Sequence, residues 1–189
     1  MAKSLHQMTS QELGKLFPIY LTEHDPKWKF LFSDEKNRLT EKLGDEFLVR
    51  VDHIGSTAIP GILSKPTIDI LLQVAENTPN QTIKDCFEKL GYIFIAKPEN
   101  PPPHMLFVKG YTPEGFKGQA YHVHVRYPGD WDEIRFRDYL CQHPAEAKAY
   151  ARLKIVLSEK YKYDRDGYTD AKVQFVKAIN REAKELKDK

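Results

Sequence analysis

Residues 67 to 74 form an almost uninterrupted apolar run, and this run limits the folds open to the chain more than any other feature. Such a run is typical of a central strand that is buried on both faces of a sheet. Segments with helical periodicity precede and follow it. The pattern predicts an α+β fold, in which one mixed β-sheet is covered by helices and the C-terminal third of the chain is helical.

The remaining elements are predicted from alternation, helical spacing and capping signals. Strands are expected at residues 19–22, 47–54, 67–74, 92–96, 105–109 and 120–126, with 111–118 as a polar connection inside an antiparallel hairpin. Helices are expected between Thr9 and Pro18, from Asp25-Pro26 to Gly44, from Thr78-Pro79 to Gly91, from Asp130 through Tyr139, from Pro144, and after Thr169. We expect one domain, with a helical extension at 1–18, a sheet core at 19–128 and a helical part at 129–189.

Composition narrows the class of protein. The chain has 189 residues, of which 41% are hydrophobic, and this suits one domain of ordinary size. The formal net charge of +2 excludes a polybasic nucleic-acid coat, so nucleic acid is a disfavoured partner. No apolar run is long enough to span a membrane, and residues 1–10 lack the apolar stretch of a signal peptide. Cys86 and Cys141 have no metal-binding spacing. A cytoplasmic protein without a membrane partner is therefore expected.

A loop rich in small residues follows the strand at 47–54. It runs from His53 to Gly61 and is followed by Lys65. Small residues allow a backbone to approach a phosphate closely, and hydroxyl and backbone N–H groups can donate to its oxygens. The loop predicts a phosphate-binding site at Gly55, Ser56, Thr57 and Lys65. The alternative is a tight glycine turn without a ligand.

Asp69 interrupts the apolar run of the central strand. Burying a carboxylate is costly unless a cation, a metal or a hydrogen-bond donor meets it. Mg²⁺ is commonly held by one or two carboxylates together with phosphate oxygens, so Asp69 is a candidate metal ligand and catalytic residue. Lys65 or a backbone N–H group is the alternative partner.

These motifs resemble the signature of the GrpB-like family, a branch of the nucleotidyltransferase superfamily. The resemblance extends over about residues 20 to 180. Its matches are the loop from His53 to Gly61, Lys65-Pro66, Ile68-Asp69-Ile70, Asp25-Pro26-Lys27-Trp28, Tyr121-His122-Val123-His124-Val125, Phe136-Arg137-Asp138-Tyr139-Leu140, His143-Pro144, Leu153-Lys154, Tyr168 and Lys172.

The resemblance implies that Gly-Ser holds a nucleoside triphosphate and that two strand aspartates, two positions apart, hold two Mg²⁺ ions. The chain departs from this pattern at Leu71, which stands two residues after Asp69 and cannot bind a metal. The superfamily's third carboxylate also has no evident match. The neighbouring strand offers His122 and His124 instead.

His122 and His124 share one face of their strand because they are two residues apart. With His53 and Asp69 they are candidates for a mononuclear site that holds Zn²⁺, Mn²⁺ or Fe²⁺, or for a phosphate pocket without a metal. A hydrogen-bonded pair of histidines is the alternative. The basic residues Arg126, Arg137, Lys154 and Lys172 are candidates to neutralise phosphates, beside Tyr168. Trp28 and Phe32 are assigned to packing.

The first functional hypothesis is a protein of nucleotidyltransferase fold that binds a nucleotide or another phosphorylated small molecule, with Mg²⁺ or Mn²⁺ as a candidate cofactor. Transfer of a nucleotidyl group is a further option. The second hypothesis is a non-catalytic binding or regulatory module with a degenerate metal site. GrpB-like domains resemble a segment fused to dephospho-coenzyme A kinases, which would suit a role near coenzyme A synthesis. The third is a metal-dependent hydrolase that uses the histidines.

Overall fold

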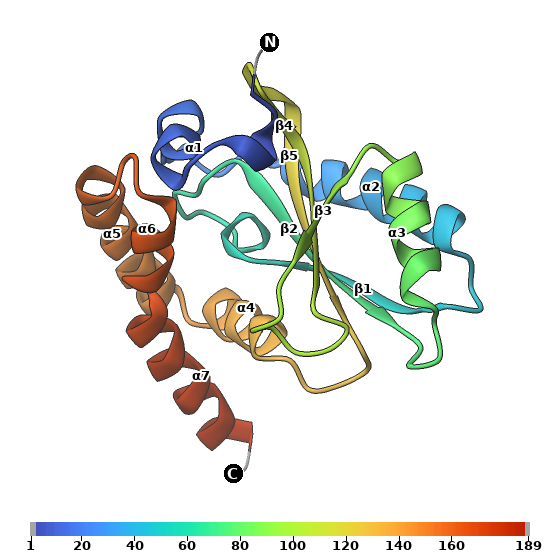
Figure 1. Ribbon diagram of the computed structural model, residues 1–189. Helices are drawn as coiled ribbons and strands as arrows, with labels where there is room; N and C mark the ends of the chain where they lie inside the picture. The colour runs from blue at the N-terminus through green and yellow to red at the C-terminus, as the bar shows by residue number, and fades with distance from the viewer. Residues whose placement is uncertain (1–2, 188–189) are drawn as a thin grey trace.

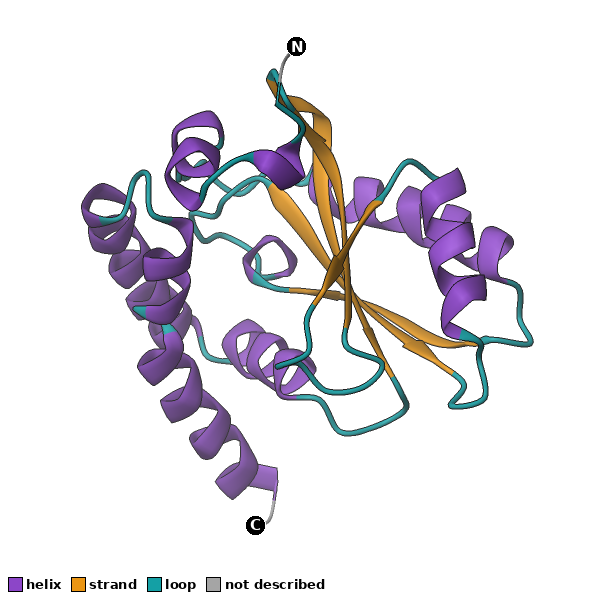
Figure 2. Cartoon of the chain, in the orientation of Figure 1, coloured by secondary structure: helices purple, strands orange, loops and turns teal. Residues whose placement is uncertain are grey.

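The computed structural model describes residues 3–187 and has an α+β architecture built on one mixed sheet (Figures 1 and 2). The five strands lie in the order β1-β2-β5-β4-β3. Their bounds are Leu48–Ile54 for β1, Thr67–Val74 for β2, Ile93–Ala96 for β3, Met105–Thr112 for β4 and Gly115–Arg126 for β5. The predicted fold class is confirmed.

Strand β2 occupies the bounds predicted from its apolar run, and it lies between two other strands. It pairs antiparallel with β1 and parallel with β5. Strand β5 in turn pairs antiparallel with β4, as the predicted hairpin requires. Strand β2 has a neighbouring strand on each side and helices over both faces of the sheet. A strand in such a buried position is expected to be apolar.

The hairpin departs from the sequence prediction at residues 111–118. These residues were expected to form a polar connection, but β4 continues to Thr112 and β5 begins at Gly115. Gly110 permits this, because it adopts φ +89° at a register shift where a Cβ atom would lie 2.5 Å from the Gln119 carbonyl oxygen. Residues 111–118 are polar because they lie where the β4–β5 pair extends past the rest of the sheet. Tyr111 is therefore a strand residue.

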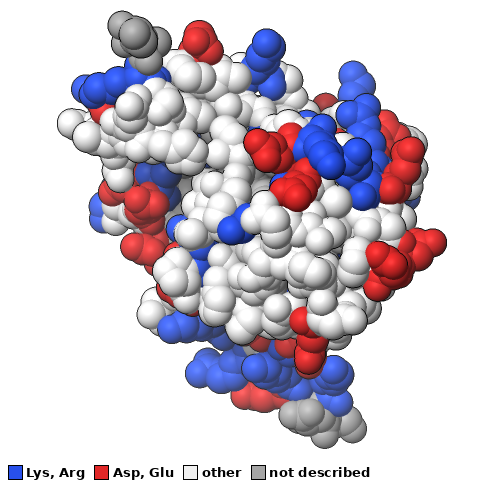
Figure 3. Space-filling view, turned by 45° about the vertical axis from the view of Figure 1, so that its right-hand side comes forward, with Lys and Arg blue, Asp and Glu red and all other residues white. Residues whose placement is uncertain are grey.

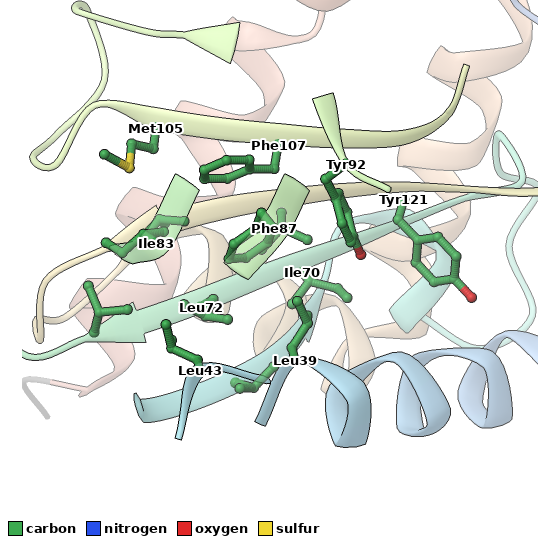
Figure 4. Packing of buried hydrophobic residues seen from close by; sticks show 14 of the residues in the cluster. Leu39, Leu43, Ile70, Leu72, Ile83, Phe87, Tyr92, Met105, Phe107 and Tyr121 are labelled. Carbon is green, nitrogen blue, oxygen red and sulfur yellow. The ribbon is translucent and has the colours of Figure 1, made fainter. Parts of the chain in front are cut away.

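Helices α2 (Lys27–Leu43) and α3 (Asn80–Lys89) cover one face of the sheet (Figure 1). Asp25 accepts a hydrogen bond from the Lys27 N–H, and Gly44 ends α2 at φ +83°, as the capping signals predicted. The core beneath these helices is formed by Leu39, Ile70, Leu72, Ile83, Phe87, Phe107 and other apolar side chains (Figure 4). Trp28 belongs to this core, which confirms its packing role.

Helices α4 (Asp132–Gln142), α5 (Pro144–Lys160), α6 (Arg165–Asp170) and α7 (Val173–Lys187) lie on the other side of the sheet (Figure 1). They pack around a second apolar cluster that includes Ile59, Phe136, Leu140, Tyr150 and Ile179. The helix predicted after Thr169 is α7, which begins at Val173, whereas Thr169 itself lies inside α6, a helix that was not predicted. Asp164 caps that helix by accepting a hydrogen bond from the Gly167 N–H.

The N-terminal part contains the short 3-10 helix η1 (Leu5–Gln7) and helix α1 (Ser10–Leu16). The capping box of Thr9 and Glu12 forms as predicted. Residues 19–22, predicted as a strand, contribute only a single bridge between Thr22 and Ser64. Pro18, which lacks a backbone N–H donor, precedes this stretch.

On the face shown in Figure 3, Lys and Arg lie beside Asp and Glu around a broad area without charged residues. Such a mixed surface agrees with the small net charge. Cys86 and Cys141 are free thiols. Between residues 3 and 187, no helix combines the length and the apolar character needed to cross a membrane.

Candidate functional site

A cavity of about 1650 Å³ lies on the face of the sheet that faces α5, α6 and α7. Its floor comes from strands β2, β3, β4 and β5, and its walls come from the loop after β1, the C-terminal helices and the N-terminal segment. The pairing register explains the floor. Asp69 lies opposite His122 and Leu71 lies opposite His124, so these four side chains share one face.

Asp69 takes part in a hydrogen-bonded chain that crosses the cavity floor. Its Oδ1 is 3.1 Å from Nδ1 of His122, and Nε2 of the same imidazole is 2.7 Å from the Tyr111 hydroxyl. Arg165 donates to that hydroxyl at 3.3 Å. His122 is therefore the partner that the carboxylate needs, whereas the sequence had suggested Lys65, a backbone N–H group or a metal.

The Asp69 carboxyl group is held in its charged form. Burial favours the neutral form, but the hydrogen bond and charge of His122, with smaller contributions from His124 and Lys65, outweigh it and lower the pKa of Asp69. The side chain is still 28% exposed, toward the cavity. Burial lowers the pKa of His124 to about 4, so this second imidazole is neutral at pH 7.

Leu71 lies on the same face as Asp69, as predicted, and is fully buried. The carboxylate opposite it on β1 is Asp52, but Arg50 binds that group at 2.7 Å and Arg137 lies 3.7 Å from it. Asp52 is therefore already paired. In residues 3–187, no group of three or more His, Cys, Asp or Glu side chains is arranged to hold a metal ion. The donors present do not fit a two-metal centre.

His53 does not join the other histidines, so the predicted four-residue metal site is not assembled. His53 lies opposite Ile70, on the face that α2 covers, and its ring stacks on Phe32 with centroids 4.7 Å apart. Its Nε2 is 3.0 Å from the Thr57 hydroxyl. Successive side chains of a strand point to opposite faces, so His53 points away from the cavity while its neighbour Ile54 lies opposite Asp69. Phe32 thus has the packing role that the sequence indicated.

The loop after β1 brings two of its predicted phosphate-binding residues to the cavity. Gly55 and Ser56 line it, and Gly55 adopts φ +69°. A Cβ atom at Gly55 would lie 2.4 Å from Oδ2 of Asp69, so only glycine allows this approach. Thr57 is different, because its buried hydroxyl donates to the Thr67 carbonyl. The assignment of Thr57 to phosphate binding is corrected to a structural role.

Three lysines gather around two tyrosines on the helical wall. The ammonium groups of Lys65 and Lys172 lie 5.3 and 4.3 Å from the ring centroid of Tyr168, and that of Lys154 lies 4.7 Å from the centroid of Tyr150. Lys154 is 1% exposed and donates to the Leu63 carbonyl and, at 3.4 Å, to the Ser64 hydroxyl. With Arg165 these residues form what we call the cation cluster: Lys65, Lys154, Arg165 and Lys172.

Burial, together with neighbouring positive charge, lowers pKa values in the cation cluster. Burial, reinforced by the neighbouring cations, lowers the pKa of Lys65 to about 7 and that of Lys154 to about 7. Burial lowers the pKa of Lys172 to about 8, against the attraction of Asp69. An anion in the cavity would reverse these shifts by favouring the charged ammonium groups.

Two other predicted cations lie outside the cavity. Arg126 is 3% exposed, donates to the Val125 carbonyl and is 3.4 Å from Glu133, so its assignment to phosphate is corrected to a structural one. Arg137 donates to the His53 carbonyl at 2.7 Å. Both arginines are used to hold the sheet to α4.

Sequence reasoning missed Tyr111 and Arg165. Tyr111 was assigned to the connection between two strands. It would have been predicted to share a face with Lys109 only if the strand had been extended beyond residue 109. Arg165 begins a six-residue helix whose Asp164 cap was the available signal. Its other anchor, the Phe17 carbonyl at 2.9 Å, is 148 residues away and has no local signal.

The family model described as GrpB protein matches residues 18–182. The chain belongs to the GrpB family. The glutamate-rich protein GrpB of Alkalihalophilus pseudofirmus is 37% identical over 85% of this chain and 93% of its own length. The crystal structure of the conserved protein GrpB from Enterococcus faecalis has a TM-score of 0.78 at 29% identity, covering 90% of this chain and all of that one.

Two further relatives are longer than this chain. A UPF0157 protein of Pseudomonas aeruginosa is 40% identical over 82% of this chain, which spans 63% of that protein's length. A dephospho-CoA kinase of Mycolicibacterium paratuberculosis is 26% identical over 94% of this chain and 49% of its own length. GrpB-like sequence therefore also occurs as part of longer chains.

Proposed function

We propose that the cavity binds the phosphate groups of a nucleotide or another phosphorylated small molecule. The observation that carries the proposal is the cation cluster. Its four residues line one cavity, and no carboxylate of residues 3–187 lies within 4 Å of any of their charged groups. Gathering unpaired cations is unfavourable, and an anionic ligand removes that penalty.

Phosphate suits this arrangement better than a carboxylate does. Lysine ammonium groups bind phosphates as point charges, and an arginine guanidinium can donate to two phosphate oxygens at once. Ser56, which also lines the cavity, adds a hydroxyl that can donate to a phosphate oxygen. Several cations spread over one cavity favour a ligand with more than one phosphate over a single inorganic phosphate ion.

The residues on the floor of the cavity favour a non-catalytic binding module over a nucleotidyltransferase. The superfamily's mechanism needs at least two strand carboxylates, and Leu71 and the paired Asp52 leave Asp69 alone. The proposal therefore gives the phosphates to the cation cluster and assigns no step to a metal. The resemblance to dephospho-CoA kinases adds coenzyme A precursors to the ligands that deserve testing.

Thermal unfolding with each of several ligands tests the proposal. The ligands are the four ribonucleoside triphosphates, tripolyphosphate and coenzyme A precursors, each with Mg²⁺, with Mn²⁺ or with EDTA. A ligand at 100 times its Kd stabilises the folded state by about 2.7 kcal/mol, which is roughly 5 to 10 °C for a chain of this size. We expect such a shift with a polyphosphate ligand in EDTA.

Lys172→Gln should reduce the shift, because it removes one member of the cation cluster. Lys148→Gln is the matched control, since Lys148 is exposed on α5 and lies outside the cavity. A shift seen only with Mg²⁺ or Mn²⁺ would favour a transferase with a metal at Asp69. If no ligand stabilises the protein, or if both variants behave alike, the proposed function is wrong.

A further inference from the structure

An apolar strip continues the floor of the cavity beyond the histidines. It consists of Ile93 and Ile95 on β3 and Leu106 and Val108 on β4, all of which line the cavity. Ile93 lies opposite Val108 and Ile95 lies opposite Leu106, so the four side chains share one face. Val108 in turn lies opposite His122, and Leu106 lies opposite His124. The apolar strip therefore borders the His122–Asp69 pair directly.

The apolar strip is a part of the sheet that helices leave open. Ile93, Ile95 and Leu106 remain partly exposed, whereas Phe107, which points to the other face of β4, is 1% exposed. Leu5, Met8 and Leu13 of the N-terminal segment line the same cavity. Leaving apolar side chains open in a cavity forfeits about 25 cal/mol per Å² of burial, so an apolar surface in a cavity is typical of a ligand site.

The dimensions relate the apolar strip to the cation cluster. From Asp69 on β2 to Ile93 on β3 there are three strand spacings, or about 14 Å. Arg165 of the cation cluster donates to the Tyr111 hydroxyl, which lies 2.7 Å from Nε2 of His122, so the cluster borders the His122–Asp69 pair. A ligand with phosphates at one end and an organic body at the other can therefore reach both regions across the floor.

We propose that the apolar strip is the subsite for the base of a nucleotide whose phosphates lie at the cation cluster. This inference rests on the proposed function and narrows its ligand class. The side chains of Ile, Leu and Val present no hydrogen-bonding atoms, so the hydroxyl groups of a phosphosugar would lose their water partners there without replacement. The flat face of a base loses no hydrogen bond when it packs on aliphatic groups.

Two kinds of ligand, with and without a nucleoside, test this inference. ATP, GTP, CTP and UTP carry a base on a ribose, and tripolyphosphate carries neither. Leu106→Asn should weaken binding of at least one nucleoside triphosphate about tenfold, the effect expected from losing a good apolar contact, and change tripolyphosphate affinity less than twofold. Ile95→Thr, which keeps the β-branched shape, should act in the same direction. Both are measured by isothermal titration in EDTA.

Val49→Thr is the matched control, since Val49 is 53% exposed on β1 and lies outside the cavity. Circular dichroism verifies that each variant is folded. If tripolyphosphate binds to the wild type but neither variant separates it from the nucleoside triphosphates, the base subsite is wrong and the proposed function stands. If the wild type binds neither tripolyphosphate nor any nucleoside triphosphate, the base subsite is wrong. The proposed function falls as well if no coenzyme A precursor binds.

Discussion

The two faces of strands β2 and β5 differ completely although the same two segments build both. Toward α2 and α3 the strands present Ile68, Ile70, Leu72, Val123 and Val125, all with 0% exposure. Toward the cavity, β2 and β5 present Asp69, Gln73, His122 and His124, with Leu71 and Ala120 as apolar exceptions. One face is used for stability, and the other concentrates the groups that can meet a ligand.

This difference teaches how the fold keeps a charged site in the middle of its sheet. The apolar face buries enough surface to hold the strands together, so the opposite face can carry a carboxylate and two imidazoles. Substitutions on the first face should therefore change the free energy of unfolding, and substitutions on the second should change ligand binding or its pH dependence.

The largest effect is expected from a pair of substitutions on β4. Phe107→Ala should lower the free energy of unfolding by about 4 kcal/mol, because the ring is buried and stacks on Phe87 with centroids 4.1 Å apart. Leu106→Ala, one residue earlier and facing the cavity, should cost clearly less. Urea unfolding of both variants measures this. Equal losses would contradict the division of the two faces.

Leu71→Asp tests whether Leu71, an apolar residue of the cavity face, stands in place of a metal-binding carboxylate. In EDTA it should lower the free energy of unfolding by about 3 kcal/mol, because a carboxylate would be buried near Asp69 and Asp52. Mg²⁺ should restore part of this loss if Leu71 replaces a lost metal ligand, and Leu71→Asn controls for polarity without charge. Unfolding curves that do not respond to Mg²⁺ would rule out the lost-ligand explanation.

The pH dependence of stability should reveal Lys154. Its pKa is lowered to about 7 by burial, whereas the unfolded chain keeps the proton until about pH 10.4. Between these values the unfolded state binds more protons, so stability rises with pH and is lost as pH falls toward 7. Lys154→Met should reduce this slope by up to about 1.4 kcal/mol per pH unit. Denaturant titrations from pH 7 to 10 measure the free energy of unfolding. If its slope against pH is the same in Lys154→Met, Lys154 does not cause the pH dependence.

The smallest effect is expected at the loop after β1. Ser56→Ala should weaken tripolyphosphate binding by about 1 kcal/mol, because a single neutral hydrogen bond is lost at an open site. Thr57→Ser keeps the hydroxyl that donates to the Thr67 carbonyl and should leave binding unchanged. Titration calorimetry compares the two, and an affinity that Ser56→Ala does not alter would remove this hydroxyl from the site.

Local patterns were enough to predict most of the elements. The apolar run gave β2 its bounds, Thr9 with Glu12 located α1, and Asp25 with Gly44 bracketed α2. The failures lie where local signals are weak. The six-residue α6 depends on one aspartate cap, and the strand at residues 111–112 continues only because Gly110 tolerates close contact with Gln119.

The sequence by itself determined the family, the strand that carries Asp69 and the face that Leu71 shares with it, since these depend on motif and on a period of two. Only the tertiary structure decided which residues meet. It separated His53 from His122, assigned Asp69 to that imidazole, and joined Lys65 to Lys172 across 107 positions of sequence. Pairing partners and helix packing are long-range choices, and no local pattern encodes them.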